Sequence, residues 1–298
     1  MSPAVELTPA VLREQALPTV TGDSDKEARG RVLVVGGGSE VPGAVMLAAI
    51  AALRSGAGKL QIAAPRRLQA ILGLAVPEAR VFGLPETADG ELAAEAADRL
   101  AQTVERCGAV VIGPGMLDER GAGALTLRLL EGGHGAGFVV DAGAMTGLAD
   151  QLDRLKAIDA RIVLTPHAGE MAALTGQSRE AVEAQPEAAA RAAAERLGSV
   201  VALKGETTFI AAPDGGLWRH ADGVVGLATS GSGDVLAGII GGLLARGAAP
   251  AQAALWGVYV HGQAGVRLSR KVAPLGFLAR EILDEIAPVL AGLGPSTA

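Results

Sequence analysis

Aromatic residues are scarce in this chain: Phe, Trp and Tyr together make up 2% of its 298 residues. An activity that stacks nucleic-acid bases on aromatic rings is therefore not expected, and the core must be built from aliphatic side chains. Positive charge is also in short supply, because 26 Lys and Arg stand against 32 Asp and Glu, for a formal net charge of -6. Nucleic-acid-binding surfaces are normally basic, so we expect no nucleic-acid partner.

The chain has a single cysteine, Cys107, which excludes an internal disulfide and any paired-cysteine metal or redox motif. Cys107 precedes a strand pattern, where a small buried side chain is expected. Long apolar runs are missing too, because Val41–Leu53 and Val235–Ala245 both fall short of the roughly 20 residues of a membrane span. The first residues lack the basic head and apolar run of an export signal. We therefore expect a soluble, cytoplasmic protein without a membrane partner.

Aliphatic sequence is what the chain has in abundance: 49% of its residues are hydrophobic and only 19% are charged. Short runs of Val, Ile and Leu alternate with helical patterns, which predicts an α/β fold of three layers, with helices on both faces of a mostly parallel central sheet. The predicted strands are Arg31–Val35, Lys59–Ala63, Glu78–Gly83, Ala109–Ile112, Gly137–Val140, Arg161–Leu164 and Val200–Leu203. The predicted helices are Gly43–Ser55, Glu91–Arg106, Gly121–Glu131, Glu187–Leu197, Gly233–Arg246, Pro250–Leu268 and Phe277–Leu290.

A β-hairpin is predicted before the C-terminal helices. Thr207–Ala212 and Gly216–His220 flank a Pro-Asp-Gly sequence, which is typical of a tight turn. No internal repeat or linker divides the chain, so we expect a single catalytic domain over residues 29–290. Residues 1–28 are predicted to form a peripheral N-terminal extension, and residues 291–298 a flexible tail.

Glycine-rich or polar clusters directly follow five of the predicted strands. They are Gly36–Ser39, Gly113–Gly115, Asp141–Gly143, Thr165–Glu170 and Lys204–Gly205. The carboxyl ends of parallel strands meet at one edge of a sheet, and open α/β sheets bind their ligands at that edge. The sequence therefore predicts one ligand site built from all five clusters.

The sharpest single motif is TSGSGD at Thr229–Asp234, which leads directly into a predicted helix. Glycines ahead of a helix let backbone amides turn towards an anion, and the helix N-terminus adds partial positive charge. The lysine and the spacing of a P-loop are both missing, and so is the dinucleotide fingerprint. In the simplest interpretation Asp234 is only an N-terminal helix carboxylate. The two serines and two glycines ahead of it favour an anion site instead.

Several short motifs occur in order along the chain. They are Pro42–Ala44, Ala52–Gly58, Gly113–Gly115, TPHAGE at Thr165–Glu170, LKGETT at Leu203–Thr208, GSGD at Gly231–Asp234, and His261–Gly265. Their combination resembles the ADP-dependent (S)-NAD(P)H-hydrate dehydratase family of the ribokinase-like superfamily. The resemblance covers roughly residues 30–283 and implies a three-layer α/β/α ribokinase-like fold. The chain departs from the family pattern at Gly143, where a second acidic residue is common, and at Ala168, where proline is common.

The resemblance implies an enzyme that repairs NADH or NADPH hydrated at C6 of the nicotinamide ring. A phosphoryl group from ADP would convert the C6 hydroxyl into a phosphate that leaves readily, with NAD(P)H, AMP and phosphate as products. Such a reaction needs a base for the hydroxyl, an anion cradle and charge neutralisation. Asp234 is the predicted catalytic base, beside an anion cradle at Ser230–Gly233.

The family motifs also imply binding residues. The adenine nucleotide is expected to contact Lys204, Gly205, Glu206, Thr207, Thr208 and Gly233. The hydrated dinucleotide is expected to contact Ala44, Gly115, His167 and Asp234. A helix terminus stabilises an anion by only about 0.3–1 kcal/mol, so Lys204 and Mg²⁺ are expected to supply the remaining positive charge. Glu170 and Asp141 are candidates to hold the waters of that ion, and no residue is assigned as a direct metal ligand.

The C-terminal helices carry the remaining candidates. His261, Trp256 and Tyr259 share one predicted helix and are interpreted as a packing face or a subunit contact rather than a site. The family resemblance implies a homotetramer and a functional partnership with an NAD(P)H-hydrate epimerase.

Two other functions stay open for the same residues. A ribokinase-like small-molecule kinase, such as a vitamin-precursor kinase, would use Asp234 and the anion cradle but release a stable phosphorylated product. A non-catalytic nucleotide-binding module would bind the nucleotide without turnover, and replacing Asp234 would then change nothing measurable.

Overall fold

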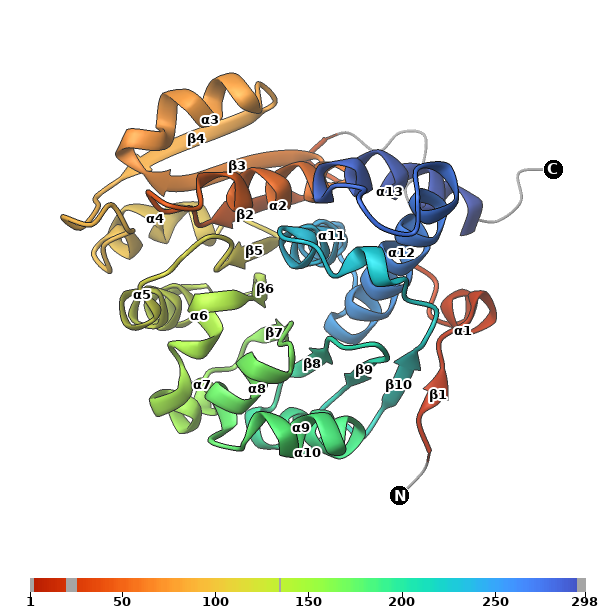
Figure 1. The fold of residues 1–298 in the computed structure, drawn as a ribbon. Helices are drawn as coiled ribbons and strands as arrows, with labels where there is room; N and C mark the ends of the chain where they lie inside the picture. Colours follow the sequence, from red (N-terminus) through yellow and green to blue (C-terminus); the bar gives the residue numbers. More distant parts are fainter. Residues whose placement is uncertain (1–2, 20–25, 134, 294–298) are drawn as a thin grey trace.

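Ten strands form one sheet in the computed structural model, which describes residues 3–19, 26–133 and 135–293 (Figure 1). The order across the sheet is β1-β10-β9-β8-β7-β6-β5-β2-β3-β4. The strands are β1 (Val5–Glu6), β2 (Arg31–Val35), β3 (Lys59–Pro65), β4 (Ala79–Leu84), β5 (Ala109–Ile112), β6 (Gly137–Val140), β7 (Arg161–Leu164), β8 (Val200–Leu203), β9 (Thr208–Ala211) and β10 (Leu217–His220). Among these ten strands, only β9 is antiparallel to its neighbours β8 and β10. The mostly parallel sheet and its hairpin are therefore confirmed.

Helices cover both faces of this sheet, so the three-layer α/β/α architecture is confirmed as well (Figure 1). The helices are α1 (Pro9–Glu14), α2 (Pro42–Arg54), α3 (Gln69–Ala75), α4 (Ala96–Val104), α5 (Glu119–Gly132), α6 (Ala142–Thr146), α7 (Leu152–Ala157), α8 (Ala168–Thr175), α9 (Arg179–Ala184), α10 (Pro186–Leu197), α11 (Ser232–Ala245), α12 (Pro250–Lys271) and α13 (Ala279–Leu293). Short 3₁₀ turns are η1 (Arg66–Leu68), η2 (Ala149–Gln151) and η3 (Val225–Leu227).

Buried side chains form two hydrophobic clusters, one on each face of the sheet. In β2, Val32 and Val34 belong to the cluster under α2, α11 and α12, whereas Leu33 and Val35 belong to the cluster under α4, α5 and α10. This alternation is the two-residue period of a strand, and burial on both faces explains the near-continuous aliphatic runs. Cys107 is buried just ahead of β5, as predicted, and burial raises the pKa of its thiol to about 11.

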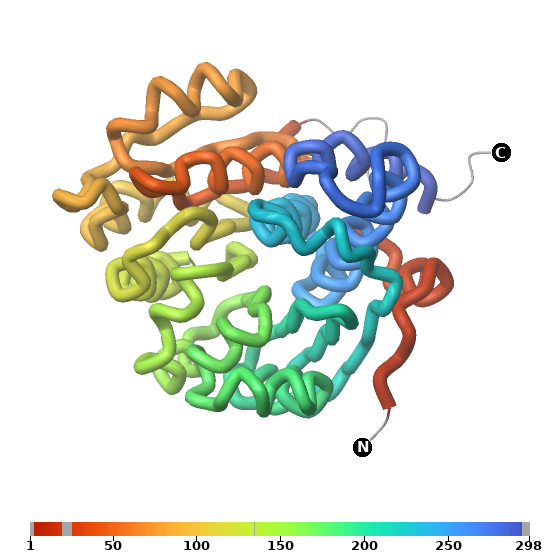
Figure 2. Tube along the Cα trace, in the orientation of Figure 1, coloured from red at the N-terminus to blue at the C-terminus, as the bar shows by residue number. Residues whose placement is uncertain are grey.

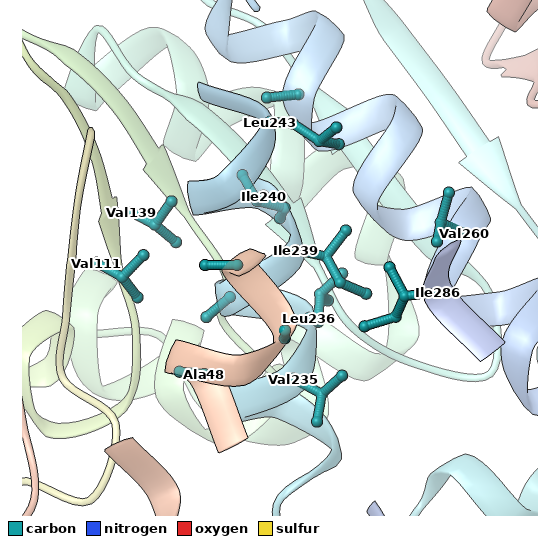
Figure 3. Close-up of a cluster of buried hydrophobic side chains, with 14 of the residues drawn as sticks. Ala48, Val111, Val139, Val235, Leu236, Ile239, Ile240, Leu243, Val260 and Ile286 are labelled. Carbon is teal, nitrogen blue, oxygen red and sulfur yellow. The ribbon is translucent and has the colours of Figure 1, made fainter. Parts of the chain in front are cut away.

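Helix α11 is buried along almost its whole length, because it lies between the sheet and helices α2, α12 and α13 (Figure 3). Glycines permit this close contact. A Cβ at Gly238 would overlap the backbone of Ala48 on α2, and a Cβ at Gly241 would overlap the side chain of Val111 on β5. Close packing on several sides leaves the helix little freedom to shift, so its N-terminus has a fixed place at the carboxyl edge of the sheet.

Residues 5–14 are part of the packed structure, which corrects the interpretation of residues 1–28 as peripheral. Strand β1 pairs in parallel with β10 at the edge of the sheet, and Leu7 and Leu12 are buried. The indole Nε1 of Trp256 on α12 donates a hydrogen bond to the Gln15 carbonyl at 2.8 Å. These contacts join distant parts of the chain, and no local sequence pattern indicates them.

The domain bounds at residues 29 and 290 stay a prediction. Residues 1–2, 20–25 and 294–298 of the two outer segments lie outside the described residues. Helix α13 runs to Leu293 and lies beside α2, which comes far earlier in the chain (Figure 2). Across the described part of the chain, no helix is both long enough and apolar enough to span a lipid bilayer.

The predicted strands and helices begin and end within three residues of the observed bounds, with one exception. The helix predicted over Glu91–Arg106 begins only at Ala96. Glu91 lies buried ahead of the helix, where its carboxylate accepts a hydrogen bond from the Leu117 amide at 3.1 Å. A tertiary contact thus replaces the first helical turn that the local pattern favours.

We expect Leu12→Ala to lower the free energy of unfolding by about 2–4 kcal/mol, because truncating a buried leucine leaves a cavity in the core. Leu74→Ala is the matched control: Leu74 is 84% exposed on α3, so its truncation should change stability by no more than about 0.5 kcal/mol. Urea denaturation followed by circular dichroism measures both values. Equal effects of the two substitutions would show that the segment around Leu12 is peripheral after all.

Candidate functional site

Five strand ends meet where the sequence predicts a ligand site. Strands β8, β7, β6, β5 and β2 are consecutive parallel neighbours in the sheet, so the loops that follow them lie along one edge. These loops carry the clusters Gly36–Ser39, Gly113–Gly115, Asp141–Gly143, Thr165–Glu170 and Lys204–Gly205. The prediction that all five clusters share one edge is confirmed.

The loops after β2 and β5 pack directly against each other. The Gly37 amide donates a hydrogen bond to the Pro114 carbonyl at 2.7 Å. Gly115 has a φ of +72°, and a Cβ at this position would lie 3.0 Å from the Cβ of Ala44 at the start of α2. Only glycine tolerates both the left-handed backbone and this close approach. Ala44 and Gly115 therefore form a wall from which nothing larger than a methyl group protrudes.

A cavity of about 470 Å³ opens beside this wall. It is lined by Val41, Ala44, Gly115, Met116, Leu117, Glu119, Ala142, Gly143, Thr146, His167, Gly169, Glu170, Ala173 and Asp234. All four residues predicted to contact the hydrated dinucleotide, Ala44, Gly115, His167 and Asp234, are among them. The structure brings these residues together around one space, and the ligand they contact stays a prediction.

Asp234 lies in the first turn of α11, which follows Gly231 in the left-handed conformation with a φ of 88°. Burial raises the pKa of the Asp234 carboxyl to about 7. The neighbouring carboxylates of Asp141 and Glu170 add to this shift, and the Lys204 ammonium opposes it. A carboxylate with a pKa near the working pH is well suited to accept a proton, and the role of Asp234 as a general base stays a prediction.

Lys204 lies among three carboxylates. Its Nζ is 3.2 Å from Asp141 Oδ1 and 3.7 Å from Glu170 Oε2, and Thr165 donates its hydroxyl to the same Asp141 oxygen at 2.7 Å. Burial acts to lower the pKa of Lys204, but the carboxylates of Asp141, Glu170 and Asp234 outweigh it and raise that pKa above its ordinary value. Lys204 therefore stays charged, and it is a single ammonium against three acidic groups.

His167 has a structural role besides its place in the cavity wall. It caps α8, where its Nδ1 accepts hydrogen bonds from the amides of Gly169 at 3.0 Å and Glu170 at 3.2 Å. Glu170 Oε2 accepts one from the His167 amide at 2.8 Å, which makes the cap reciprocal. This cap fixes the helix start at Ala168, where the family pattern has proline. The His167 side chain stays 59% exposed, so it remains accessible to a ligand.

The residues predicted to contact the adenine nucleotide lie beside the cavity rather than in its wall. Lys204 begins the loop between β8 and β9, Gly205 and Glu206 are exposed, and Thr208 begins β9. Lys204 Nζ lies 3.3 Å from the position that a Cβ of Gly233 would take, so this loop adjoins the start of α11. The structure brings the six residues near one another, and their contact with a nucleotide stays a prediction.

One side chain at the site does more than the sequence pattern indicates. The pattern places His261 on a packing face with Trp256 and Tyr259, and both of these are buried. His261 Nε2, however, lies 2.9 Å from the hydroxyl of Ser232 in the GSGD turn. The only sequence signal for this contact is that both residues fall in family motifs, because their spacing does not reveal that they touch.

The residues of the site fit a magnesium ion that keeps its own waters. Within residues 3–19, 26–133 and 135–293, no three His, Cys, Asp or Glu side chains are grouped as a set of metal ligands. Mg²⁺ commonly binds through one or two carboxylates, several waters and the phosphates of a substrate. Asp141 and Glu170 are donors of this kind, and the excess of negative charge around Lys204 favours a second cation.

The chain is similar to known proteins over most of its length. The family described as NAD(P)H-hydrate dehydratase matches residues 32–288. The ADP-dependent (S)-NAD(P)H-hydrate dehydratase of Xanthomonas campestris pv. campestris is 50% identical over 95% of both chains. The bifunctional NAD(P)H-hydrate repair enzyme Nnr of Moorella thermoacetica is 39% identical, over 96% of this chain and 54% of that protein. This chain thus spans about half the length of the bifunctional relative.

A solved structure has the same fold. It is the ADP/ATP-dependent NAD(P)H-hydrate dehydratase from Bacillus subtilis, co-crystallized with ATP and Mg²⁺, which is 29% identical and matches with a TM-score of 0.83. The match covers 98% of this chain and 99% of that one. The ribokinase-like fold predicted from the motifs is thereby confirmed.

We expect Asp234→Asn to stabilise the fold above neutral pH. The carboxyl holds its proton up to about pH 7 in the folded state but only to about pH 4 in the unfolded chain. The wild-type protein therefore loses stability progressively as the pH rises from about 4 to 7. Asparagine has no proton to lose, so the free energy of unfolding should exceed that of wild type by roughly 2–3 kcal/mol near pH 8.

Urea titrations near pH 4.5 and near pH 8 measure this difference. Asp159→Asn, at an exposed aspartate, is the control. Its effect on the free energy of unfolding should be small and the same at the two pH values. A stability gain for Asp234→Asn that does not grow with pH would contradict the raised pKa.

Proposed function

This chain belongs to the NAD(P)H-hydrate dehydratase family and is an enzyme of that reaction, and we propose that Asp234 is its catalytic base. The enzyme returns the S-hydrate of NADH or NADPH to the reduced dinucleotide at the expense of ADP, with AMP and phosphate as products. The proposal rests on one observation: the Asp234 carboxyl lines the cavity with its pKa raised to about 7 by burial.

The hydrate carries its hydroxyl on C6 of the nicotinamide ring, and hydroxide is a poor leaving group. Asp234 accepts the hydroxyl proton while the oxygen attacks the terminal phosphorus of ADP, and the bond between that phosphorus and the oxygen of AMP breaks. The electron pair of the ring nitrogen then expels the phosphate from C6. Loss of a proton from C5 restores the dihydropyridine, so hydrate and ADP give NAD(P)H, AMP and phosphate.

Two groups of the chain itself supply positive charge for the transferred phosphoryl group in this proposal. The anion cradle is the turn at Ser230–Gly233, which leads into α11, and the helix terminus contributes about 0.3–1 kcal/mol. Lys204 adds a full charge and is the larger of the two. The ADP side is assigned to Lys204, Gly205, Glu206, Thr207, Thr208 and Gly233, which adjoin the cavity.

The hydrated dinucleotide occupies the cavity in this proposal. Ala44 and Gly115 form a smooth wall, which lets the ring approach the backbone closely. The cap at α8 holds the imidazole of His167 in place, and its Nε2 can hydrogen-bond the nicotinamide or a ribose. Asp234 lies in the cavity wall directly after Gly233, between the two ligands, where hydroxyl and phosphoryl group must meet.

Mg²⁺ would neutralise charge on the diphosphate of ADP when bound. We propose that Asp141 and Glu170 hold its waters, since both carboxylates already lie close to the Lys204 ammonium. The hydroxyl of Thr165 orients Asp141 before any ligand arrives. Co-crystallisation of the Bacillus subtilis relative with ATP and Mg²⁺ supports this choice of ion.

We further propose a cytoplasmic homotetramer that works with a separate NAD(P)H-hydrate epimerase. The S-specific reaction leaves the other hydrate stereoisomer unrepaired, and an epimerase would convert that isomer into the substrate. The Moorella repair enzyme is bifunctional, and the match to this chain covers 54% of it. Assembly and location rest on the family resemblance.

Purified protein incubated with the S-hydrate of NADH, ADP and Mg²⁺ should restore the near-ultraviolet absorbance of the dihydronicotinamide. Nucleotide chromatography should show equal amounts of AMP and NADH formed. EDTA should stop the reaction, and added Mg²⁺ should restore it. A stable phosphorylated product without recovery of NADH would indicate a small-molecule kinase instead, and ADP binding without turnover would indicate a nucleotide-binding module.

Asp234→Asn should lower kcat by about 100- to 10,000-fold, because an amide cannot accept the hydroxyl proton. AMP binding, measured by calorimetry, should survive. In the wild-type enzyme kcat/KM should rise with pH up to about 7 and then level off, since the ionised carboxylate is the active form. The exposed Asp159→Asn serves as the control for both measurements. A pH profile that keeps its rise in Asp234→Asn would rule this aspartate out as the base.

A further inference from the structure

One side chain of the GSGD turn points into the protein rather than towards a ligand. Ser232 is the first residue of α11 and is 4% exposed, and its Oγ lies 2.9 Å from His261 Nε2. Backbone bonds close the turn: the Ser232 amide donates to the Thr229 carbonyl at 3.2 Å, and the Val235 amide to the Gly231 carbonyl at 3.1 Å. The Ser232 hydroxyl links this turn to a different helix, α12.

Helix α12 supports the same segment at a second point, one helical turn away. Gly265 follows His261 by four residues, so both lie on the same face of α12. A Cβ at Gly265 would lie 2.6 Å from Cγ of Leu227, and Leu227 ends the turn η3 just ahead of the GSGD motif. Because Gly265 has no side chain, Leu227 packs on the backbone of α12. His261 and Gly265 thus hold both ends of residues 227–232.

The surroundings of His261 keep its imidazole neutral. Burial lowers its pKa to about 4. A hydrogen bond with the Ser232 backbone opposes this shift, and the Lys204 ammonium and the His220 ring add to it. A neutral imidazole has one donor and one acceptor nitrogen. Depending on the tautomer, Nε2 therefore either donates a hydrogen bond to the Ser232 hydroxyl or accepts one from it. The bond to Ser232 therefore places no second positive charge beside Lys204.

The turn that His261 holds carries the groups on which the proposed reaction depends. The turn at Ser230–Gly233 is the proposed anion cradle, and Asp234 follows Ser232 by two residues in the same turn. The body of α11 is fixed by its burial, but the first turn of any helix lacks part of its internal hydrogen bonding. A misplacement of reacting groups by about 1 Å can cost on the order of 100-fold in rate.

We propose that His261 is a positioning residue for the phosphoryl-transfer step. Through its bond to Ser232 it holds the cradle amides against the transferred group and Asp234 against the attacking hydroxyl. The kinetic part of this inference rests on the proposed function. Its effect on ADP affinity does not, because the cradle binds the nucleotide before any chemistry.

Three substitutions of His261 separate its hydrogen bond from its packing. Phenylalanine fills the space without a polar atom. The amide group of glutamine reaches about as far as Nε2 of histidine, whereas the shorter asparagine reaches only about as far as Nδ1. We expect kcat to fall about tenfold or more in His261→Phe and His261→Asn, and to stay within about threefold of wild type in His261→Gln. KM for the NADH hydrate should stay unchanged. ADP affinity, measured by calorimetry without the hydrate, should weaken in the Phe and Asn variants only.

Ser232→Ala should reproduce the loss, and the double variant with His261→Phe should be no worse than either single variant, because both remove the same bond. His220→Gln is the matched control. His220 is buried and lies against Gly262, beside His261, and its ring nitrogens have no hydrogen-bond partner within the described residues. This control should change the melting temperature but neither kcat nor ADP affinity.

Two results would overturn the proposal: single-variant effects that multiply in the double variant, or a His261→Phe protein with wild-type kcat and wild-type ADP affinity. Wild-type protein without turnover would overturn the proposed function instead. The ADP affinities of the variants would in that case still decide the role of His261.

Discussion

The site depends on the burial of one helix, α11, between the sheet and three other helices (Figure 3). At Gly238 and Gly242 the backbone of α11 packs directly on α2. A Cβ at Gly238 would overlap the backbone of Ala48, and a Cβ at Gly242 would overlap the backbone of Ala52. A helix enclosed this tightly cannot slide along its axis without opening voids on several sides. Close packing in the core, rather than the loops, therefore sets how far Asp234 lies from the strand ends that carry its neighbours.

This fixed arrangement gathers more negative charge than the local cation balances. Asp141 and Glu170 surround Lys204, and the same two carboxylates act on Asp234 across the site. Together with burial, which is the larger cause, they raise the pKa of Asp234 to about 7. Such a pKa suits the base that we propose and also makes the ionised form unfavourable to folding. Stability and the proposed catalytic role thus oppose each other at this one residue. The same excess of charge is what makes a divalent cation beside a bound diphosphate chemically reasonable.

The sequence predicts the edge of the sheet well because two local facts combine there. Each strand is a short aliphatic run with a glycine or polar cluster after it, and parallel topology brings those ends together, so Asp141 and Lys204 are expected to meet although 63 residues separate them. Contacts that depend on how elements pack are not predictable in this way. Leu12 is buried in one of the two core clusters without a local pattern that says so. The bond between His261 and Ser232 depends on the rotation of α12 against α11, which periodicity does not specify.

The departure from the family pattern at Gly143 follows from the same geometry. A Cβ at Gly143 would overlap the backbone carbonyl of Met116 in the loop after β5, so the second acidic side chain common in the family has no room in this arrangement. Its absence leaves one carboxylate fewer in the wall of the cavity. Since Asp141 and Glu170 already raise the pKa of Asp234, a further carboxylate nearby would raise that pKa again. Glycine at this position therefore helps to keep the pKa of the proposed base low enough for part of it to be ionised at neutral pH.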